Sequence, residues 1–299
     1  MLNIVQNKKI WFTISGILVG LSLVAIAVYG FRQSAEFLGG SMWEFQIPAN
    51  QPSLATVQDV FANTLKADGS TVTFDSTNNS FLARFNIIDE ATHQKYLSEA
   101  QTALPSFTEL SFSSIGPSVG AGLKKNALIA IGLVLIGISL YIAFAFRKAS
   151  RPVSSWKYGW VTLLTLFHDV CIPAGLLAVL GRFSGVEIDT NFIVALLVVM
   201  GFSVHDTIVV FDRIRENLVT HRGKASFATV VNDSVNQTIA RSVNTSLTLI
   251  LVLLALFFVG PADLHYFVLT LLVGVTTGIY SSIFIASPAL VLLKPKNEL

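Results

Sequence analysis

The sequence predicts an α-helical membrane protein with six transmembrane helices and one α+β domain between the first and second helix. Hydrophobic residues make up 53% and charged residues only 13% of the 299 residues, whereas globular domains carry about 25% charged residues. The mean hydropathy is +0.65. Runs of about 20 apolar residues, enough to cross a ~30 Å hydrocarbon core, occur at Ile10–Phe31, Ala127–Phe146, Tyr158–Leu180, Asn191–Phe211, Ser242–Gly260 and Tyr266–Ile285.

The first apolar run follows Lys8 and Lys9, as the apolar part of a signal peptide would. It is longer than an ordinary signal-peptide core, and no A-x-A cleavage site follows it. We therefore expect residues 1–31 to form a cytoplasmic N-terminus and a retained membrane helix.

Lysine and arginine in the short connections predict the orientation. A six-span chain places four of the polar segments on one side of the membrane, and basic residues mark the cytoplasmic side. The loop Gly181–Thr190 has only Arg182, and Pro261–Leu264 has no basic residue. Both termini, including a tail at 294–299, are expected in the cytoplasm, and the domain at 32–125 outside it. The basic residues of the four segments are Lys8, Lys9, Arg147, Lys148, Arg151, Lys157, Arg213, Arg215, Arg222, Lys224, Lys294 and Lys296.

The polar domain has the patterning of a soluble βαββαβ unit. Alternating residues at Thr71–Asp75 and Phe81–Ile87 flank the turn signal Asn78-Asn79 and predict a hairpin. Ser53 and Asp89 are predicted to cap helices that reach about Leu65 and Leu104. Further strands are expected at Ser41–Ile47 and Phe107–Ile115. This order suits a ferredoxin-like sandwich, with two helices on one face of a four-stranded antiparallel sheet.

The charge balance and the cysteine content exclude some functions. Twenty basic and 18 acidic residues give a net charge of +2, which does not favour nucleic-acid binding. The single cysteine, Cys171, excludes an intrachain disulfide framework and a cysteine-rich metal site. We expect Cys171 to be a small buried apolar residue.

Two glycine motifs and one amphipathic segment lie in or beside the membrane helices of region 126–293. Gly16-x-x-x-Gly20 and Gly274-x-x-x-Gly278 predict close helix packing, with a sliding or partner surface as the alternative. Residues 212–241 combine charges with apolar positions at helical spacing. They are expected to lie along the cytoplasmic membrane surface or to form a solvated connector.

Ionisable residues inside the predicted spans are the strongest site candidates, because a buried charge in a membrane is costly. Asp169 lies in the third span, Asp206 in the fourth, and Arg241 at the start of the fifth. The last two can lie at similar depth and are predicted to pair, so that protonation of Asp206 would release Arg241. Static roles as a buried ion pair, or for Asp169 as a polar contact, are the alternatives. Nearby hydroxyl and amide side chains either hold water or bond to helix carbonyls.

The segment GFSVHDTIVVFDRIREN at Gly201–Asn217 resembles the fourth-helix signature of the SecF family, subunits of the bacterial SecDF protein-export complex within the resistance–nodulation–division superfamily. LFHDV at 166–170, QTIARSVNTS at 237–246 and GPSVG at 116–120 also match, as does the order of helices and outer domain. The resemblance implies proton-transport roles for Asp206 and Arg241 and, through the family's HDV element, for Asp169. His205, Phe202 and the segment EFLGGS at 36–41 depart from the family's pattern.

His205 stands where the family usually has asparagine, which does not titrate near neutral pH. It is therefore expected to support a neighbour by hydrogen bonding rather than to relay a proton. His168 and Thr207 are the other candidates for hydrogen-bond support.

The resemblance implies a proton-driven accessory subunit, not an enzyme, with protons as the coupling ion and no bound cofactor. The implied partners are SecD, the SecYEG channel, the translocating preprotein, a YidC-type insertase and membrane lipids. The implied location is the bacterial cytoplasmic membrane. An exporter of lipid or a small molecule from the same superfamily is the alternative transport function.

A metal-binding protein is an alternative from another class. His168-Asp169 and His205-Asp206 are plausible zinc ligands near Cys171. However, adjacent helix residues point about 100° apart and do not readily share one ion. No H-E-x-x-H or nucleophile-elbow motif indicates a protease.

Overall fold

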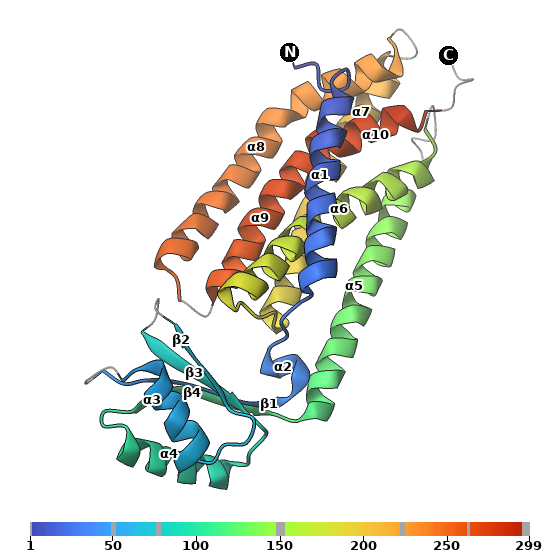
Figure 1. Ribbon diagram of the computed structural model, residues 1–299. Helices are drawn as coiled ribbons and strands as arrows, with labels where there is room; N and C mark the ends of the chain where they lie inside the picture. Colours follow the sequence, from blue (N-terminus) through green and yellow to red (C-terminus); the bar gives the residue numbers. More distant parts are fainter. Residues whose placement is uncertain are drawn as a thin grey trace. The chain divides into compact units, whose positions relative to one another are not determined.

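The computed structural model describes residues 2–48, 52–75, 79–147, 153–221, 225–261 and 264–294. The chain divides into two compact units, one of residues 1–32 and 129–299 and one of residues 33–128. Figure 1 shows both units. Several of the basic residues used to predict orientation, namely Lys148, Arg151, Arg222, Lys224 and Lys296, lie outside the described residues.

Six helices in the described residues are long and apolar enough to cross a membrane, which confirms the predicted number. The sixth is continuous through a π-helical turn, η3. The helices are α1 (Lys8–Tyr29), α5 (Pro117–Ala145), α6 (Ser155–Ser184), α7 (Thr190–His221), α8 (Phe227–Val259) and the run α9 (His265–Ser281), η3 (Ser282–Ala286) and α10 (Ser287–Leu292).

Most of these helices extend beyond the apolar runs that predicted them. Helix α5 begins at Pro117 rather than Ala127, and α8 begins at Phe227 rather than Ser242. Hydropathy identifies only the part of a helix that is apolar enough to lie in hydrocarbon. The backbone hydrogen bonds of the helix continue beyond that part into amphipathic turns. The segment 212–241 is therefore not one separate surface helix. It is divided between the end of α7 and the beginning of α8.

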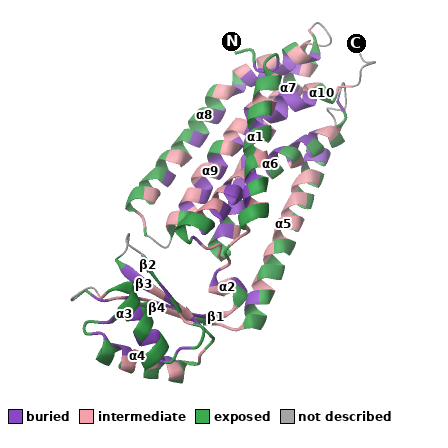
Figure 2. Cartoon of the chain, in the orientation of Figure 1, coloured by how far each residue is buried: buried purple, intermediate pink, exposed green. Residues whose placement is uncertain are grey.

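The interior of the helical unit is formed mainly by α6, α7 and α9. Helix α6 packs against α1, α7 and α9, and α7 also packs against α8 and α9. Buried residues gather on α6, α7 and α9, while α1, α5 and α8 are largely exposed (Figure 2). The buried polar side chains of these helices, such as Asp169, Ser203 and Ser281, are thereby removed from lipid and from water.

The N-terminal segment is attached to the beginning of α8. The backbone N–H groups of Leu2 and Ile4 donate to the side-chain oxygens of Asn236 and Asn232, at 2.8 and 3.0 Å. Ile4 and Val5 are buried in the same apolar cluster as residues of α8. These contacts hold the start of α8 close to the start of α1.

The second unit has the predicted ferredoxin-like order. Its antiparallel sheet runs β2-β3-β1-β4, and Ser53 and Asp89 cap the helices as expected by accepting from the N–H groups of Thr56 and Thr92. A short helix, α2 (Ala35–Leu38), precedes the sheet and was not predicted. The elements are β1 (Gly40–Gln46), α3 (Leu54–Asp59), η1 (Val60–Thr64), β2 (Thr71–Asp75), β3 (Ser80–Phe85), α4 (Glu90–Ala103) and β4 (Thr108–Ile115).

The predicted hairpin between β2 and β3 is present, although residues 76–78 of its turn lie outside the described residues. Asn79 has a φ of 53°, a left-handed conformation that asparagine tolerates. The hydrogen bonds from Thr92 hold the pKa of Asp89 below its ordinary value.

Trp43 is the centre of the aromatic core of this unit. It is fully buried and makes edge contacts with Phe45, Phe61 and Phe107. Its indole N–H donates to Glu109 over 2.6 Å. Aromatic contacts of this kind contribute beyond the area they bury, so Trp43 is a principal stabilising residue of the sandwich.

Candidate functional site

Asp206 is a buried acid on α7, in the middle of a membrane-spanning helix. Its side chain faces α8 and is 4% exposed. Ser242 of α8 lies against it. Neither Asp206 Oδ2 nor Ser242 Oγ has a hydrogen-bond partner among the described residues. The carboxyl group is therefore buried, and its own chain does not supply enough hydrogen-bond donors to compensate for the lost contact with solvent.

Arg241 is next to Ser242 in the chain but is not brought into contact with Asp206. The predicted ion pair is absent from the described residues, and Arg241 is exposed on α8. Successive helix residues point about 100° apart. Because Ser242 faces Asp206, Arg241 is directed toward the outside of the helical unit.

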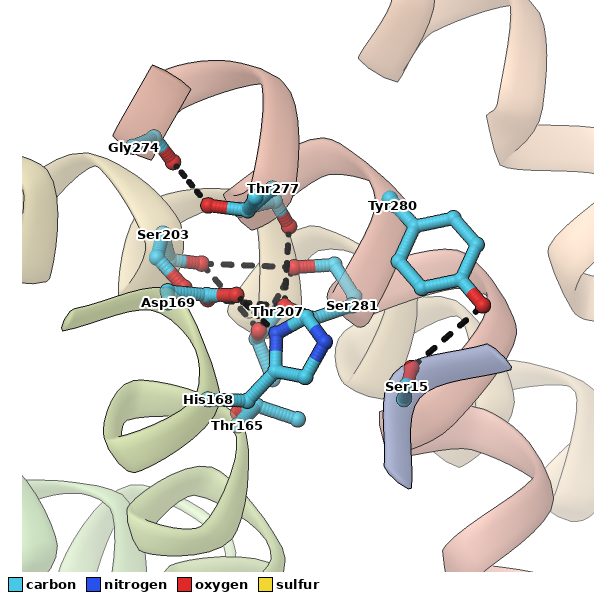
Figure 3. A network of polar contacts seen from close by, with 12 residues as sticks. Ser15, Thr165, His168, Asp169, Ser203, Thr207, Gly274, Thr277, Tyr280 and Ser281 are labelled. Atoms are coloured by element: carbon cyan, nitrogen blue, oxygen red, sulfur yellow. Dashed lines mark hydrogen bonds and ion pairs between the residues drawn. The ribbon is translucent and has the colours of Figure 1, made fainter. Parts of the chain in front are cut away.

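Asp169 on α6 is the centre of a second buried polar cluster (Figure 3). It is fully buried. Its Oδ2 accepts from the hydroxyls of Ser203 and Ser281, at 2.5 and 2.7 Å. Its Oδ1 is 2.8 Å from His168 Nδ1. These contacts join α6, α7 and α9, so Asp169 has the well-compensated environment that Asp206 lacks.

Thr207 extends the same cluster into the π-helical turn. Its hydroxyl is 2.8 Å from Ser282 Oγ and also donates to the carbonyl of Ser203. Of the residues proposed for hydrogen-bond support, Thr207 and His168 both lie in this cluster. The hydrogen bonds of these two side chains go to other residues and not to Asp206.

Ser281 and Ser282 are site residues that sequence reasoning did not identify. A signal was present, since both follow Gly278 by three and four residues and so lie on its side of the helix. Gly278 is itself close to Ser203, because a Cβ at Gly278 would lie 3.2 Å from Ser203 Cβ. The glycine motif and the polar cluster therefore belong to one packed interface between α7 and the last helix.

The two glycine motifs have different environments. A Cβ at Gly274 would lie 2.2 Å from Val199 Cγ2, a separation that does not occur between real atoms. At Gly16 and Gly20, no atom of the described residues lies within 4 Å of such an atom. Gly274-x-x-x-Gly278 therefore serves close helix packing, and Gly16-x-x-x-Gly20 has an open face.

His205 is exposed, and no hydrogen bond joins it to a described residue. Its ring lies outside the buried site, although it is close enough to Asp206 to interact with it electrostatically. Of the other nearby polar residues, Thr238 donates to the Ser234 carbonyl and Asn236 to that of Leu2, while Ser246 Oγ is buried without a hydrogen-bond partner among the described residues. Cys171 is buried and free. Over the part of the chain that is described, no three histidine, cysteine or acidic residues gather as a metal site.

Comparison with known proteins identifies the family. The family model described as protein export membrane protein SecD/SecF, C-terminal, matches residues 95–296. The chain is 38% identical, over its whole length and 96% of the relative, to protein translocase subunit SecF from Thermobaculum terrenum. It is 36% identical to the subunit of that name from Anaerolinea thermophila, over 98% of this chain and 94% of the relative.

A solved structure agrees with the sequence relatives. The chain superposes on SecDF, a translocon-associated membrane protein from Thermus thermophilus, with a TM-score of 0.83 and 31% identity. The match covers 98% of this chain but only 38% of the SecDF chain. The six apolar helices and the small antiparallel sheet domain are thus shared with a multi-pass membrane protein. The chain belongs to the SecD/SecF family of protein export membrane proteins, as a relative of the translocase subunit SecF.

Proposed function

We propose that this chain uses the proton-motive force to promote translocation of proteins through the Sec channel, SecYEG, across the bacterial cytoplasmic membrane. The observation that carries the proposal is the incompletely compensated carboxyl group of Asp206 in the middle of α7. A buried ionised carboxylate without enough donors is costly, and binding a proton removes that cost. Asp206 therefore has the surroundings of a group that binds and releases a proton. In this proposal protons are the coupling ion, and the chain acts without enzymatic chemistry.

Arg241 carries the positive charge that can respond to the protonation of Asp206. It lies on α8 next to the serine that faces Asp206, so the two residues lie at a similar depth. When Asp206 is ionised, attraction between the opposite charges favours a closer approach of Arg241. When Asp206 is protonated, this attraction is lost. A change in α8 between the two states would couple proton passage to a change of shape.

SecD is the proposed partner that covers the outer side of α7 and α8. His205, Arg241 and Asn244 are exposed there within apolar helices. Polar side chains in contact with lipid are unfavourable, whereas an adjoining protein or a water-filled path supplies partners. The solved SecDF chain is more than twice as long as the part matched here, which leaves room for a second half of that kind. A YidC-type insertase and membrane lipids are further proposed partners.

The domain of residues 33–128 is proposed to lie outside the cytoplasm, with both chain termini inside, because the basic residues concentrate in the connections on the side of the termini. There it would bind emerging preprotein chains weakly. The exporter of lipid or a small molecule has no comparable support, because the relatives reported above are translocase subunits.

The proton site is tested by Asp206→Asn and Arg241→Met in vesicles that carry the chain with SecD and the channel. Each substitution removes one member of the proposed pair, so each is expected to abolish gradient-stimulated export while membrane insertion is retained. One charge that crosses the membrane contributes about 2.3 kcal/mol per 100 mV.

Asp233→Asn is the matched control, because it removes an acid of α8 that makes no contact with Asp206. It should export normally. Export by Asp206→Asn that still rises with the gradient to the native extent would falsify the proton site.

A second test removes the outer domain by deletion of Gln33–Phe112, which leaves the membrane helices in place. We expect a membrane-inserted protein without export activity, since the domain is the proposed binding surface for the emerging chain. The measurement is export in the same vesicles, with insertion checked by membrane extraction. Export at the native rate would remove the domain from the mechanism.

A further inference from the structure

One ring nitrogen of His168 is within hydrogen-bond distance of a partner, and the other is buried without one. The side chain lies on α6 beside Asp169 and is 4% exposed. Its Nδ1 is 2.8 Å from Asp169 Oδ1, while Nε2 has no hydrogen-bond partner among the described residues. Figure 3 shows the imidazole ring between the Asp169 cluster and Tyr280.

The donors around Asp169 determine which nitrogen of His168 carries hydrogen. Ser203 and Ser281 both donate to Oδ2, which is the arrangement of an ionised carboxylate. An ionised carboxylate only accepts hydrogen bonds. When Asp169 is ionised, His168 Nδ1 donates to Oδ1, and Nε2 of the neutral ring is an acceptor without a hydrogen. In that state the pair carries one negative charge inside the membrane-spanning unit.

We propose that His168 Nε2 is a second proton-accepting site, with Asp169 as the residue that orients and compensates it. A proton supplied by the gradient and bound at Nε2 converts the pair to an imidazolium and a carboxylate, with no net charge. The three hydrogen bonds to Asp169 are all retained in this step. The inference rests on the proposed proton-coupled function and adds to it a site separate from Asp206.

The groups that face His168 favour the gain and loss of one proton at this residue. The titratable ones are Asp169 on its own helix and Tyr280 of α9, whose ring centroid is 6.0 Å from that of His168. The Tyr280 hydroxyl donates to the Trp11 carbonyl of α1. From α7 and η3 the cluster receives the uncharged Ser203 and Ser282. No second charge among these groups competes with Asp169 for the imidazolium.

The pair lies where two helices have irregular backbones. Pro173 follows Asp169 by four residues in α6, so the Asp169 carbonyl lacks the usual helical N–H donor. Ser281 ends α9, and the π-helical turn η3 begins at Ser282, ahead of Pro288. Irregular turns of this kind are frequent at functional sites. Ser281, which donates to Asp169, therefore lies where the last helix changes from α-helical to π-helical geometry.

The test is solid-state nuclear magnetic resonance on the full chain with ¹⁵N-labelled histidine, reconstituted with unlabelled SecD in lipid bilayers. The chain has five histidines, and the His168 signal is assigned by its loss in His168→Gln. Between about pH 8 and about pH 5, the range in which histidine changes charge, His168 is expected to gain a proton at Nε2. In Asp169→Asn it should stay neutral over this range, because the compensating charge is absent.

A His168 ring that stays neutral in the native chain, or that titrates identically in Asp169→Asn, would overturn the proposal. The Asp206→Asn variant should keep the His168 titration, so failure of the proton role of Asp206 is observed separately. In export assays, His168→Gln should lose most gradient-dependent export, and His265→Gln, at the start of α9 and outside the Asp169 cluster, should keep it. Equal export by these two variants would also count against a role for His168.

Discussion

Gly274→Leu is expected to prevent assembly of the helical unit. The first added carbon would already lie 2.2 Å from Val199 Cγ2 and 2.7 Å from Cγ1, and Val199 is fully buried with a short, stiff side chain. Neither side chain has space to move without separating α9 from α7. Overpacking typically costs about 1–3 kcal/mol and occasionally more, and here it would also displace Ser203 and Ser281 from Asp169. The measurement is thermal stability of the purified protein in detergent, together with export in vesicles.

The first glycine motif supplies the matched control. Gly16→Leu and Gly20→Leu add the same side chain to α1 at positions with no atom of the described residues within 4 Å. Both variants should retain the native melting temperature in detergent. If Gly274→Leu were as stable as Gly16→Leu, the tight packing of α9 against Val199 would be disproved.

Trp43→Ala is expected to cause the largest single loss of stability in the domain of residues 33–128. Trp43 is fully buried, contacts several core aromatic rings and donates to Glu109. Replacement of a core tryptophan by alanine costs about 3–5 kcal/mol. In a domain of this size, such a loss lowers the melting temperature by at least about 12 °C.

Phe74→Ala is the corresponding control, because Phe74 is an aromatic residue of the same sheet that is 41% exposed. It should change the melting temperature little. Proteolysis of the domain in the full chain, followed over a temperature series, measures both variants. Equal protease resistance of Trp43→Ala and the native chain would show that the core does not depend on this residue.

The architecture could be predicted from the sequence because the order of helices and strands follows from local patterns of apolar and polar residues. Six apolar runs predicted the six helices, and alternating residues with Ser53 and Asp89 at helix starts predicted the βαββαβ order. The segment 201–217 was sufficient to predict the family, and the sequence relatives confirm that prediction. Helix ends were less predictable, since amphipathic turns outside hydrocarbon continue α7 and α8.

The buried polar contacts, in contrast, depend on which helix faces which, and a one-dimensional pattern does not contain that information. The sequence identified Asp206 and Arg241 as site residues, but the structure directs Asp206 to Ser242 and leaves Arg241 outside. It also brings Ser281 and Ser282, distant in sequence, to Asp169 and Thr207. The physical reason is that packing at Gly274 and Gly278, together with the π-helical turn after Ser281, fixes the rotation of the last helix. Residue identity alone determined that charges lie in the membrane helices, and tertiary packing decided which of them are compensated.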